Sequence, residues 1–442
     1  MDLGLLLAAD IRDSDAGPVR FIGYELSAYS IAKTLLLWEM LCTSSASSAA
    51  DEENHLRSIL QVWYSAGWSG KTMQAFSSAI ASLCSRLPEF CEPVRRLIKH
   101  WAASNGVALS SARKLWMDAT SDARSSIGRL LLRHDRIAMA RYELTGDFGL
   151  VSEPTCGSVT MFDTPDGTPP LAKNESVFST LHFKDLVPEG MLPDGTISTN
   201  PGEFFKVSLM AAAEEKVMSD LKTLRERATK GMVTVELRMQ GVQDSVKEIA
   251  AEHPWTMSWS NVLDYFNAEH FHAIARGCSV FGDTIHFGYS MNWVCGVRGT
   301  NIMDFMGPEG HNTRITVIDS ANEALSAMYH SLGWQHRLRL PPPENPYNTT
   351  GFMLQRMHYK KWADHWINAA GPECSLANLE HSLPSPLSFT GGSTVSMTWT
   401  YDLQISFSPE QANPLTPEQE REMEKTVLRA VKEGIKASRS KK

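Results

Sequence analysis

The sequence has few cysteines, and they are scattered along the chain. None of the seven cysteines forms the C-x-x-C spacing on which zinc ribbons are built, and their scatter does not suggest a disulfide framework. His270 and His272 flank Phe271, but we find no cysteine or carboxylate at metal-ligand spacing from them. We therefore expect reduced thiols, structural histidines and no metal site.

Long hydrophobic runs are also missing. No run approaches the roughly 20 apolar residues that a membrane-spanning helix needs. Leu3 to Ala9 is too short for a span, and Asp2 stands where a signal peptide would be basic. We expect no membrane partner and a cytoplasmic protein.

The chain lacks an excess of positive charge. Its formal net charge is -8, with 42 Lys and Arg against 50 Asp and Glu. A protein that coats nucleic acid non-specifically needs the opposite balance. We expect no DNA partner, and any RNA contact must come from a local basic patch.

Several common catalytic motifs are absent. There is no Walker loop, no G-x-S-x-G elbow and no H-E-x-x-H pair. The first predicted turn reads AADIRDSDAG, so the G-x-G-x-x-G turn of a dinucleotide site is missing as well. These absences argue against P-loop NTPases, serine hydrolases of the α/β-hydrolase type and dinucleotide enzymes, and we expect no cofactor.

What the chain does have is an α/β pattern over 442 residues, of which 43% are apolar. We predict a Rossmann-like, methyltransferase-like three-layer sandwich with an inserted helical lobe and a C-terminal strand-and-helix segment. The predicted segments are residues 1–48, the first part of the core; 49–150, a helical lobe with a basic face; 151–203, a loop-rich excursion with short strands; 204–408, the main core; and 409–442, a C-terminal helix and basic tail.

Within the core we predict strands at Gly4 to Ala9, Val19 to Glu25 and Val233 to Met239. A helix from Ala28 to Leu41 follows the second strand, and helices at 56–64, 71–83, 94–102 and 112–142 follow in the lobe. Asp10 and Glu25 then stand at strand ends, where nucleoside-binding folds often place a carboxylate against a ribose.

Two basic clusters lie in the helical lobe. Helical spacing puts Arg129, Arg133 and Arg136 on one face of the helix predicted for 112–142. Arg95, Arg96 and Lys99 form the second cluster. Either cluster is an ordinary solvated helix face unless the substrate is a polyanion.

An acidic motif follows the strand predicted at Val233 to Met239. Residues 244–248 read D-S-V-K-E, so Ser245 and Glu248 form the S-x-x-E pattern of a helix capping box. Alternatively, Asp244 and Glu248 present two carboxylates on one helical face, where like charges repel and favour a cationic partner. Lys247 or a substrate ammonium or guanidinium would satisfy them.

A second polar group follows in the sequence. Asn261 and Asp264 come at the end of a predicted strand, with Asp264 either the N-cap of the next helix or a ligand group. In HFGYSMNW, alternation puts His286, Gly288, Ser290 and Asn292 on one side and Tyr289 on the other, and Arg298 follows.

These segments resemble a known family. FIGYELSAYSIAKTLLLWEML, MSWSNVLDYFNAEHFHAIARGCS, HFGYSMNW and VSMTWTYD are similar to a fungal domain family related to the methyltransferase-like domain of the dynein axonemal assembly factors. Within it, the chain most resembles the fungal arginine-containing cyclodipeptide synthases, from about Leu5 to Phe407. Their acidic motif is D-D-x-x-E, and here Ser245 replaces its second carboxylate.

The resemblance implies an enzyme that uses arginyl-tRNA and a second aminoacyl-tRNA to make a cyclic dipeptide, a 2,5-diketopiperazine. The reaction needs no ATP or metal, because the ester is already activated. The resemblance implies catalysis by Asp244 and Glu248, with Ser245 as a possible acyl acceptor. It implies that Glu25 or Asp10 binds a ribose, and that the ester end is bound by Asn261, Asp264, Tyr289 and Asn292, with Arg298 nearby. The acceptor-stem phosphates would be bound by the basic clusters, Arg95, Arg96, Lys99, Arg129, Arg133 and Arg136.

Two other functions remain open from the sequence. Glu25 at a strand end is also typical of an S-adenosylmethionine-dependent methyltransferase, although the glycine-rich turn is missing. The second open function is that of a non-enzymatic assembly or scaffold protein, as the resemblance to the axonemal proteins suggests. In such a protein the carboxylates would serve only as helix caps.

Overall fold

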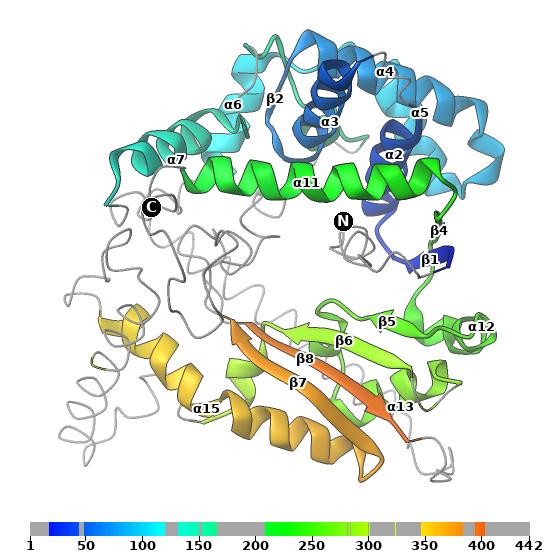
Figure 1. The fold of residues 1–442 in the computed structure, drawn as a ribbon, viewed down its shortest axis with the longest axis vertical. Helices are drawn as coiled ribbons and strands as arrows, with labels where there is room; N and C mark the ends of the chain where they lie inside the picture. The colour runs from blue at the N-terminus through cyan, green and yellow to red at the C-terminus, as the bar shows by residue number, and fades with distance from the viewer. Residues whose placement is uncertain are drawn as a thin grey trace. The chain divides into compact units, whose positions relative to one another are not determined.

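The computed structural model describes residues 17–43, 48–119, 131–149, 153–165, 208–280, 284–298, 346–382 and 394–402, together with 282, 300 and 323. The chain is a mixed α/β protein that divides into two compact units (Figure 1). Unit 1 comprises Met1–Ser245, Tyr289–Trp362 and Leu379–Ser396, and unit 2 comprises Val246–Gly288, Ala363–Asn378 and Met397–Lys442. Within the described residues, no helix combines the length and apolarity that crossing a bilayer requires.

Unit 1 is built around a layer of helices. They are α2 (Ala28–Thr43), α3 (Ala49–Tyr64), α4 (Gly70–Ser85), α5 (Glu92–Ala103) and the long α11 (Leu209–Thr229). Four of them follow a serine whose hydroxyl accepts a hydrogen bond from the third residue on: Ser27, Ser48, Ser69 and Ser208. The predicted helices at 28–41, 56–64, 71–83 and 94–102 all fall inside these elements and are confirmed.

The helix predicted for 112–142 is wrong as a single element. The structure has α6 (Leu109–Ala119) and α7 (Arg133–Thr145), and Leu132, the residue before α7, has extended backbone angles of φ -77° and ψ 135°. Residues 120–128 are rich in Ser, Thr, Asp and Gly, whose side chains or flexibility compete with helical hydrogen bonding. Arg129 and the residues around it lie outside the described part of the chain.

Aromatic side chains fill the core of unit 1. Tyr64, Trp68, Trp101, Trp116 and Tyr142 are each at most 1% exposed. A short antiparallel pair, β2 (Gly67–Trp68) and β3 (Cys156–Gly157), lies beside them and precedes the short helix α8 (Val159–Phe162). The rest of the excursion predicted for 151–203 lies outside the described residues, apart from 153–165.

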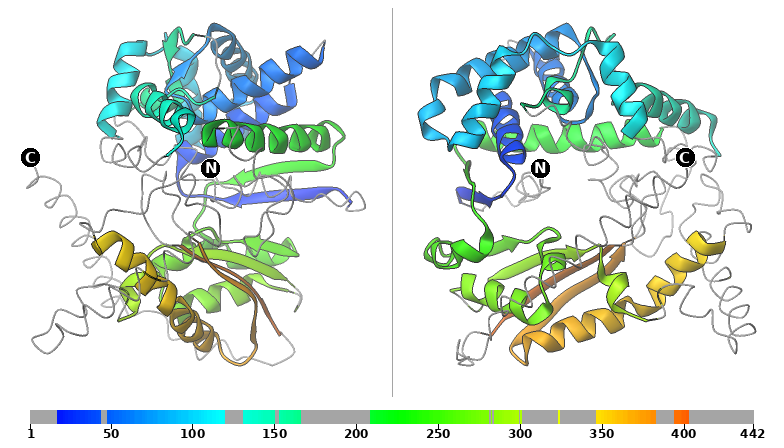
Figure 2. Two further views of the ribbon diagram at one scale, coloured as in Figure 1. Left: turned by 60° about the vertical axis from the view of Figure 1, so that its left-hand side comes forward. Right: turned by 180° about the vertical axis from the view of Figure 1, so that it is seen from behind.

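A pair of parallel strands belongs to the same unit. β1 (Val19–Tyr24) pairs with β4 (Val233–Arg238) in the register Val19↔Val233 to Tyr24↔Arg238, and Figure 2 shows the two strands side by side. Val235 and Leu237 of β4 pack on the helical core. Both strands are confirmed, whereas the strand predicted at 4–9, and Asp10 with it, lies outside the described residues.

Unit 2 contains α12 (Val246–Ala251) and α13 (Ala268–Cys278). A four-stranded sheet has the order β5 (Thr256–Ser258), β6 (Ile285–Ser290), β8 (Thr394–Tyr401) and β7 (Cys374–Ser382), and α15 (Pro346–Ala370) precedes β7 in the chain. The unit boundary falls inside β6, β7, β8 and α15. In β8, Val395, Met397, Trp399 and Tyr401 are all buried, because alternate residues of a strand face the same side.

The C-terminal helix and tail predicted at 409–442 lie outside the described residues.

Candidate functional site

The carboxyl ends of β1 and β4 lie together at one edge of their sheet. The backbone N–H of Glu25, the residue after β1, donates to Arg238 O at the end of β4, at 3.0 Å. After β4 the chain turns at Gly241, where an added Cβ would lie 3.5 Å from Asp244 Oδ2 and 3.8 Å from the Leu26 side chain. The segments that carry Glu25 and Asp244 are therefore neighbours, at the edge where α/β proteins commonly bind ligands.

Both of these carboxylates are exposed. Glu25 Oε1 accepts a hydrogen bond from Ser27 N at 2.8 Å, and Ser27 in turn begins α2. Asp244 belongs to the 3-10 turn η5 (Val242–Ser245), whose Asp244 N–H donates to Gly241 O at 3.2 Å. Glu25 thus has a structural use for one oxygen, whereas the Asp244 side chain projects from a turn.

Ser245 is held inward. It is 1% exposed, and its hydroxyl donates toward Gly241 O at 2.9 Å, with Gln240 Oε1 also within 3.2 Å. Helix α12 begins at the next residue. A hydroxyl that is buried and engaged in this way is poorly presented as an acyl acceptor.

Glu248 differs from Asp244 in its setting. It is an exposed residue of α12 and belongs to unit 2, because the boundary between the units falls between Ser245 and Val246. The sequence pattern predicted one helical face for both carboxylates, but the structure has a 3-10 turn followed by an α-helix.

Asn261 and Asp264 lie in unit 2, at the turn after β5. Asp264 is part of the 3-10 turn η6 (Val262–Tyr265) and is half-buried, and Asn261 Nδ2 donates to Tyr265 Oη at 3.5 Å. The N-cap of α13 is Asn267, whose side chain accepts from His270 N at 2.8 Å. The interpretation of Asp264 as that cap is therefore wrong.

Tyr289, Asn292 and Arg298 lie in unit 1 at the end of β6 and just beyond it. Tyr289 is half-buried, whereas Asn292 and Arg298 are exposed. Asn292 precedes the 3-10 turn η7 (Trp293–Gly296) without a side-chain capping bond.

The predicted alternation along β6 holds, but its polar side is the buried one. His286 and Gly288 are buried, whereas Phe287 is 38% exposed. An added Cβ on Gly288 would lie 2.8 Å from Leu263 and 3.2 Å from Trp399. This side of the strand therefore packs into unit 2 and does not face a ligand.

Two buried histidines organise that interior. His272 Nε2 donates to Trp366 O at 3.0 Å, so its Nδ1 accepts from Tyr401 Oη at 2.6 Å. His286 Nδ1 accepts from Trp259 Nε1 at 2.9 Å. Its Nε2 donates to the Ser279 hydroxyl, also at 2.9 Å.

Burial lowers the pKa of each of these histidines to about 3, so both are neutral near pH 7. For His272, this confirms the expectation of a structural histidine. Among the residues that the structure describes, no group of three or more His, Cys, Asp or Glu side chains is arranged to hold a metal ion.

The two basic clusters lie on different helices. In α5, Arg95 pairs with Glu92 at 2.8 Å, whereas Arg96 and Lys99 are exposed and make no ion pair with the described part of the chain. In α7, Arg133 and Arg136 are exposed. α5 and α7 lie near opposite ends of α11 (Figure 1), so the structure does not merge the clusters.

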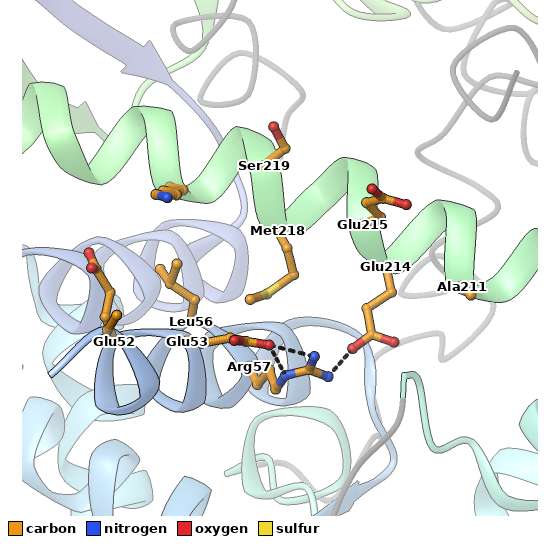
Figure 3. A pocket seen from close by; sticks show the side chains of 11 residues that line it. Glu52, Glu53, Leu56, Arg57, Ala211, Glu214, Glu215, Met218 and Ser219 are labelled. Carbon is orange, nitrogen blue, oxygen red and sulfur yellow. Dashed lines mark hydrogen bonds and ion pairs between the residues drawn. The ribbon is translucent and has the colours of Figure 1, made fainter. Parts of the chain in front are cut away.

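An open groove between α3 and α11 is a feature that the sequence patterns did not predict. It has a volume of about 560 Å³ and is lined by residues that include four carboxylates, Glu52, Glu53, Glu214 and Glu215. Arg57 pairs with Glu53 at 2.8 Å and with Glu214 (Figure 3). The hydrogen bond that Arg57 donates to Glu53, together with the charge of Glu214, raises the pKa of Arg57 above its usual value.

Comparisons with protein-family models, with curated proteins and with solved structures gave no match for this chain.

Proposed function

We propose that this protein is a tRNA-dependent cyclodipeptide synthase, which condenses arginyl-tRNA with a second aminoacyl-tRNA to a cyclo(Arg-Xaa) diketopiperazine for secondary metabolism. The observation that supports the proposal best is the pair of exposed carboxylates, Glu25 and Asp244, at the carboxyl edge of the parallel β1–β4 pair. The finer fold that we propose is a Rossmann-like three-layer sandwich, and the proposed compartment is the cytoplasm.

The chemistry needs two amide-forming steps. In each, an α-amine attacks the carbonyl carbon of an aminoacyl ester, a C–N bond forms, and the ester C–O bond breaks. The amine loses a proton and the leaving ribose hydroxyl gains one, so no net acid or base is consumed. A positioned carboxylate can accept the proton from the amine, and a second can hold a guanidinium through charge-assisted hydrogen bonds.

We assign the proton-accepting role to Asp244 and contact with the terminal ribose to Glu25. Asp244 is exposed on a turn at the strand edge, as a residue that meets a large substrate must be. Ser245 is assigned no covalent role, because its hydroxyl is buried and donates toward Gly241 O. Attack on the second ester is then direct.

The acceptor-stem phosphates are assigned to Arg96 and Lys99 of α5. Both side chains are exposed, and neither is neutralised by a carboxylate of the described chain. Arginine and lysine contacts to phosphates position a nucleic acid without reading its sequence. The α7 face is less suited to phosphates, because Ile137 and Leu144 are exposed among its arginines.

The test is expression in bacteria, which supply every aminoacyl-tRNA, followed by mass spectrometry of the medium. We expect an arginine-containing diketopiperazine. Asp244→Asn should lower the product at least about 100-fold, the scale of a lost general base, and leave the melting temperature within a few degrees. Gln243→Ala, an exposed neighbour in the same turn, is the matched control.

Two further variants sharpen the result. Ser245→Ala should retain product if attack is direct, and complete loss of product in a folded Ser245→Ala protein would favour an acyl-enzyme. Glu248→Gln tests the second carboxylate of the acidic motif in the same assay. Absence of any diketopiperazine from soluble, folded protein would overturn the proposal, and S-adenosylmethionine binding in a calorimeter would favour a methyltransferase instead.

A further inference from the structure

The outward face of α7 combines arginines with large aliphatic side chains. Arg133, Arg136, Ile137, Arg141 and Leu144 are all exposed, with Ile137 at 58% and Leu144 at 52%. At about 100° per residue these five share one side of the helix. The opposite side carries Asp135, Met139, Tyr142 and Glu143, which are buried in unit 1.

This face has no partner for its charges in the part of the chain that the structure describes. The guanidinium groups of Arg133, Arg136 and Arg141 make no hydrogen bond or ion pair with the described residues. Ile137 and Leu144 are seven residues apart, the spacing of anchors on a helix that lies in a groove. Arg136 and Arg141 flank these anchors, one on each side.

The groove between α3 and α11 has the complementary character. Four glutamates line it with two cations, Arg57 and Lys222, and Arg225 pairs with one of the glutamates, Glu52, at 3.5 Å. Four negative charges against three positive ones leave a net negative charge. Leu56 and Met218 supply apolar surface between the glutamates (Figure 3). Glu215 is exposed and makes no ion pair with any described residue.

We propose that these two surfaces bind each other between two copies of this chain. The α7 face of one copy lies in the α3–α11 groove of the other, with the two aliphatic anchors on the apolar surface and the arginines against the glutamates. Both surfaces belong to unit 1, so every copy carries both halves of the contact. The contact goes beyond the proposed function and does not depend on it.

Charge complementarity is the reason to choose a second copy as the occupant. The chain has a net charge of -8, so two copies repel each other at long range. A basic face on an acidic molecule overcomes this repulsion only where it meets an acidic surface of matching shape. RNA would match the arginines but would leave the two exposed aliphatic side chains without an apolar contact.

The test is a charge swap followed by light scattering. At low ionic strength the full chain should show a mass at or above twice the 49.1 kDa of one copy, and high salt should shift it toward one copy. Arg136→Glu with Arg141→Glu should give single copies, and so should Glu53→Lys with Glu215→Lys. A mixture of the two variants should recover the larger mass, because each acidic surface again meets a basic one.

The matched control for the α7 variant is Lys71→Glu with Lys230→Glu, which changes the net charge by the same amount at two exposed lysines outside both surfaces. This variant should keep the wild-type mass. Circular dichroism melts verify that every variant is folded, and Glu215→Lys alone replaces the double groove variant if that one unfolds.

A single-copy mass for the wild type at the highest soluble concentration would overturn the proposal. So would a mixture that stays monomeric. A loss of tRNA binding in the α7 variant without any change of mass would assign the face to RNA instead.

Discussion

His272 and His286 are two buried titratable side chains of unit 2. Each is at most 1% exposed, and each has both ring nitrogens engaged as one donor and one acceptor. Protonation of His286 would turn its accepting nitrogen into a donor that faces the indole N–H of Trp259. Protonation of His272 would force the Tyr401 hydroxyl to turn and would bury a charge. The native structure therefore requires both imidazole rings to be neutral.

The free energy of unfolding should consequently fall as the pH is lowered. The pKa of both rings is about 3 in the folded state, below the usual 6.5 of a histidine, so between these values the unfolded chain binds more protons than the native one. Each histidine then contributes a slope of about 1.4 kcal/mol per pH unit. Stability from these groups is fully present above pH 6.5 and is lost progressively toward pH 3.

Urea unfolding between pH 5 and pH 6.5 measures this slope before most carboxylates titrate. His286→Gln should reduce the slope by about 1.4 kcal/mol per pH unit near pH 5 and by about half of that near pH 6.5, since one proton-linked group is removed. An unchanged slope in a folded variant would contradict the assignment of a neutral, buried His286.

Residue types alone predicted that His272 is structural, but they did not predict its partners. Those partners, Tyr401 and Trp366, come from β8 and α15, more than ninety residues away in the chain. The cap of α13 shows the same limit at short range. Asn267 and Asp264 are both good capping residues, and the 3-10 turn over Val262–Tyr265, which decides between them, has no clear sequence signal.

At the scale of single elements, the C-terminal end of α7 depends on one glycine. α7 ends at Gly146, which has φ 70° and donates its N–H to Tyr142 O at 2.7 Å. An added Cβ would lie 2.4 Å from Ala66 Cβ and 2.9 Å from Trp116. Both the backbone angle and the packing therefore require glycine at this position.

Gly231 offers a matched comparison, because it has φ 69° but nothing within 4 Å of an added Cβ. Gly231→Ala should cost about 1 kcal/mol of unfolding free energy from the left-handed backbone alone. Gly146→Ala should cost about 2 to 4 kcal/mol, since overpacking adds to the same strain. Denaturant unfolding of the two variants measures the difference, and equal losses would show that the close approach to Ala66 relaxes freely.

Hydrophobic periodicity predicted α2 to α5 well because each carries its own apolar stripe and most have a polar start signal. It failed for α6 and α7, where two helices in succession resemble one long pattern. The groove between α3 and α11 could not be predicted at all. Its glutamates come from residues 52–53 and 214–215, and only tertiary packing brings these helices together.

At the scale of the whole molecule, the net charge of -8 sets how an RNA would have to bind. A tRNA is repelled by the chain at long range, so the proposed contacts at Arg96 and Lys99 must act locally and be sensitive to salt. Replacing both with alanine should make the slope of log affinity against log salt concentration shallower by about 1.5 to 2.

Filter binding of aminoacyl-tRNA over a salt series checks this prediction. Lys71→Ala with Lys230→Ala removes the same charge from exposed positions elsewhere and should leave the slope unchanged. If Arg136→Ala with Arg141→Ala changes the slope and the α5 variant does not, the RNA contacts belong to α7.

The parallel pairing of β1 with β4 has a consequence for biosynthesis. Tyr24 and Arg238 face each other across 214 residues of chain, so β1 leaves the ribosome long before its partner strand exists. The helices between them form mostly local contacts and can fold first, whereas non-local strand pairing is slow. Throughout that interval the nascent chain displays an unpaired strand edge, which is a template for aggregation and a natural target for a chaperone.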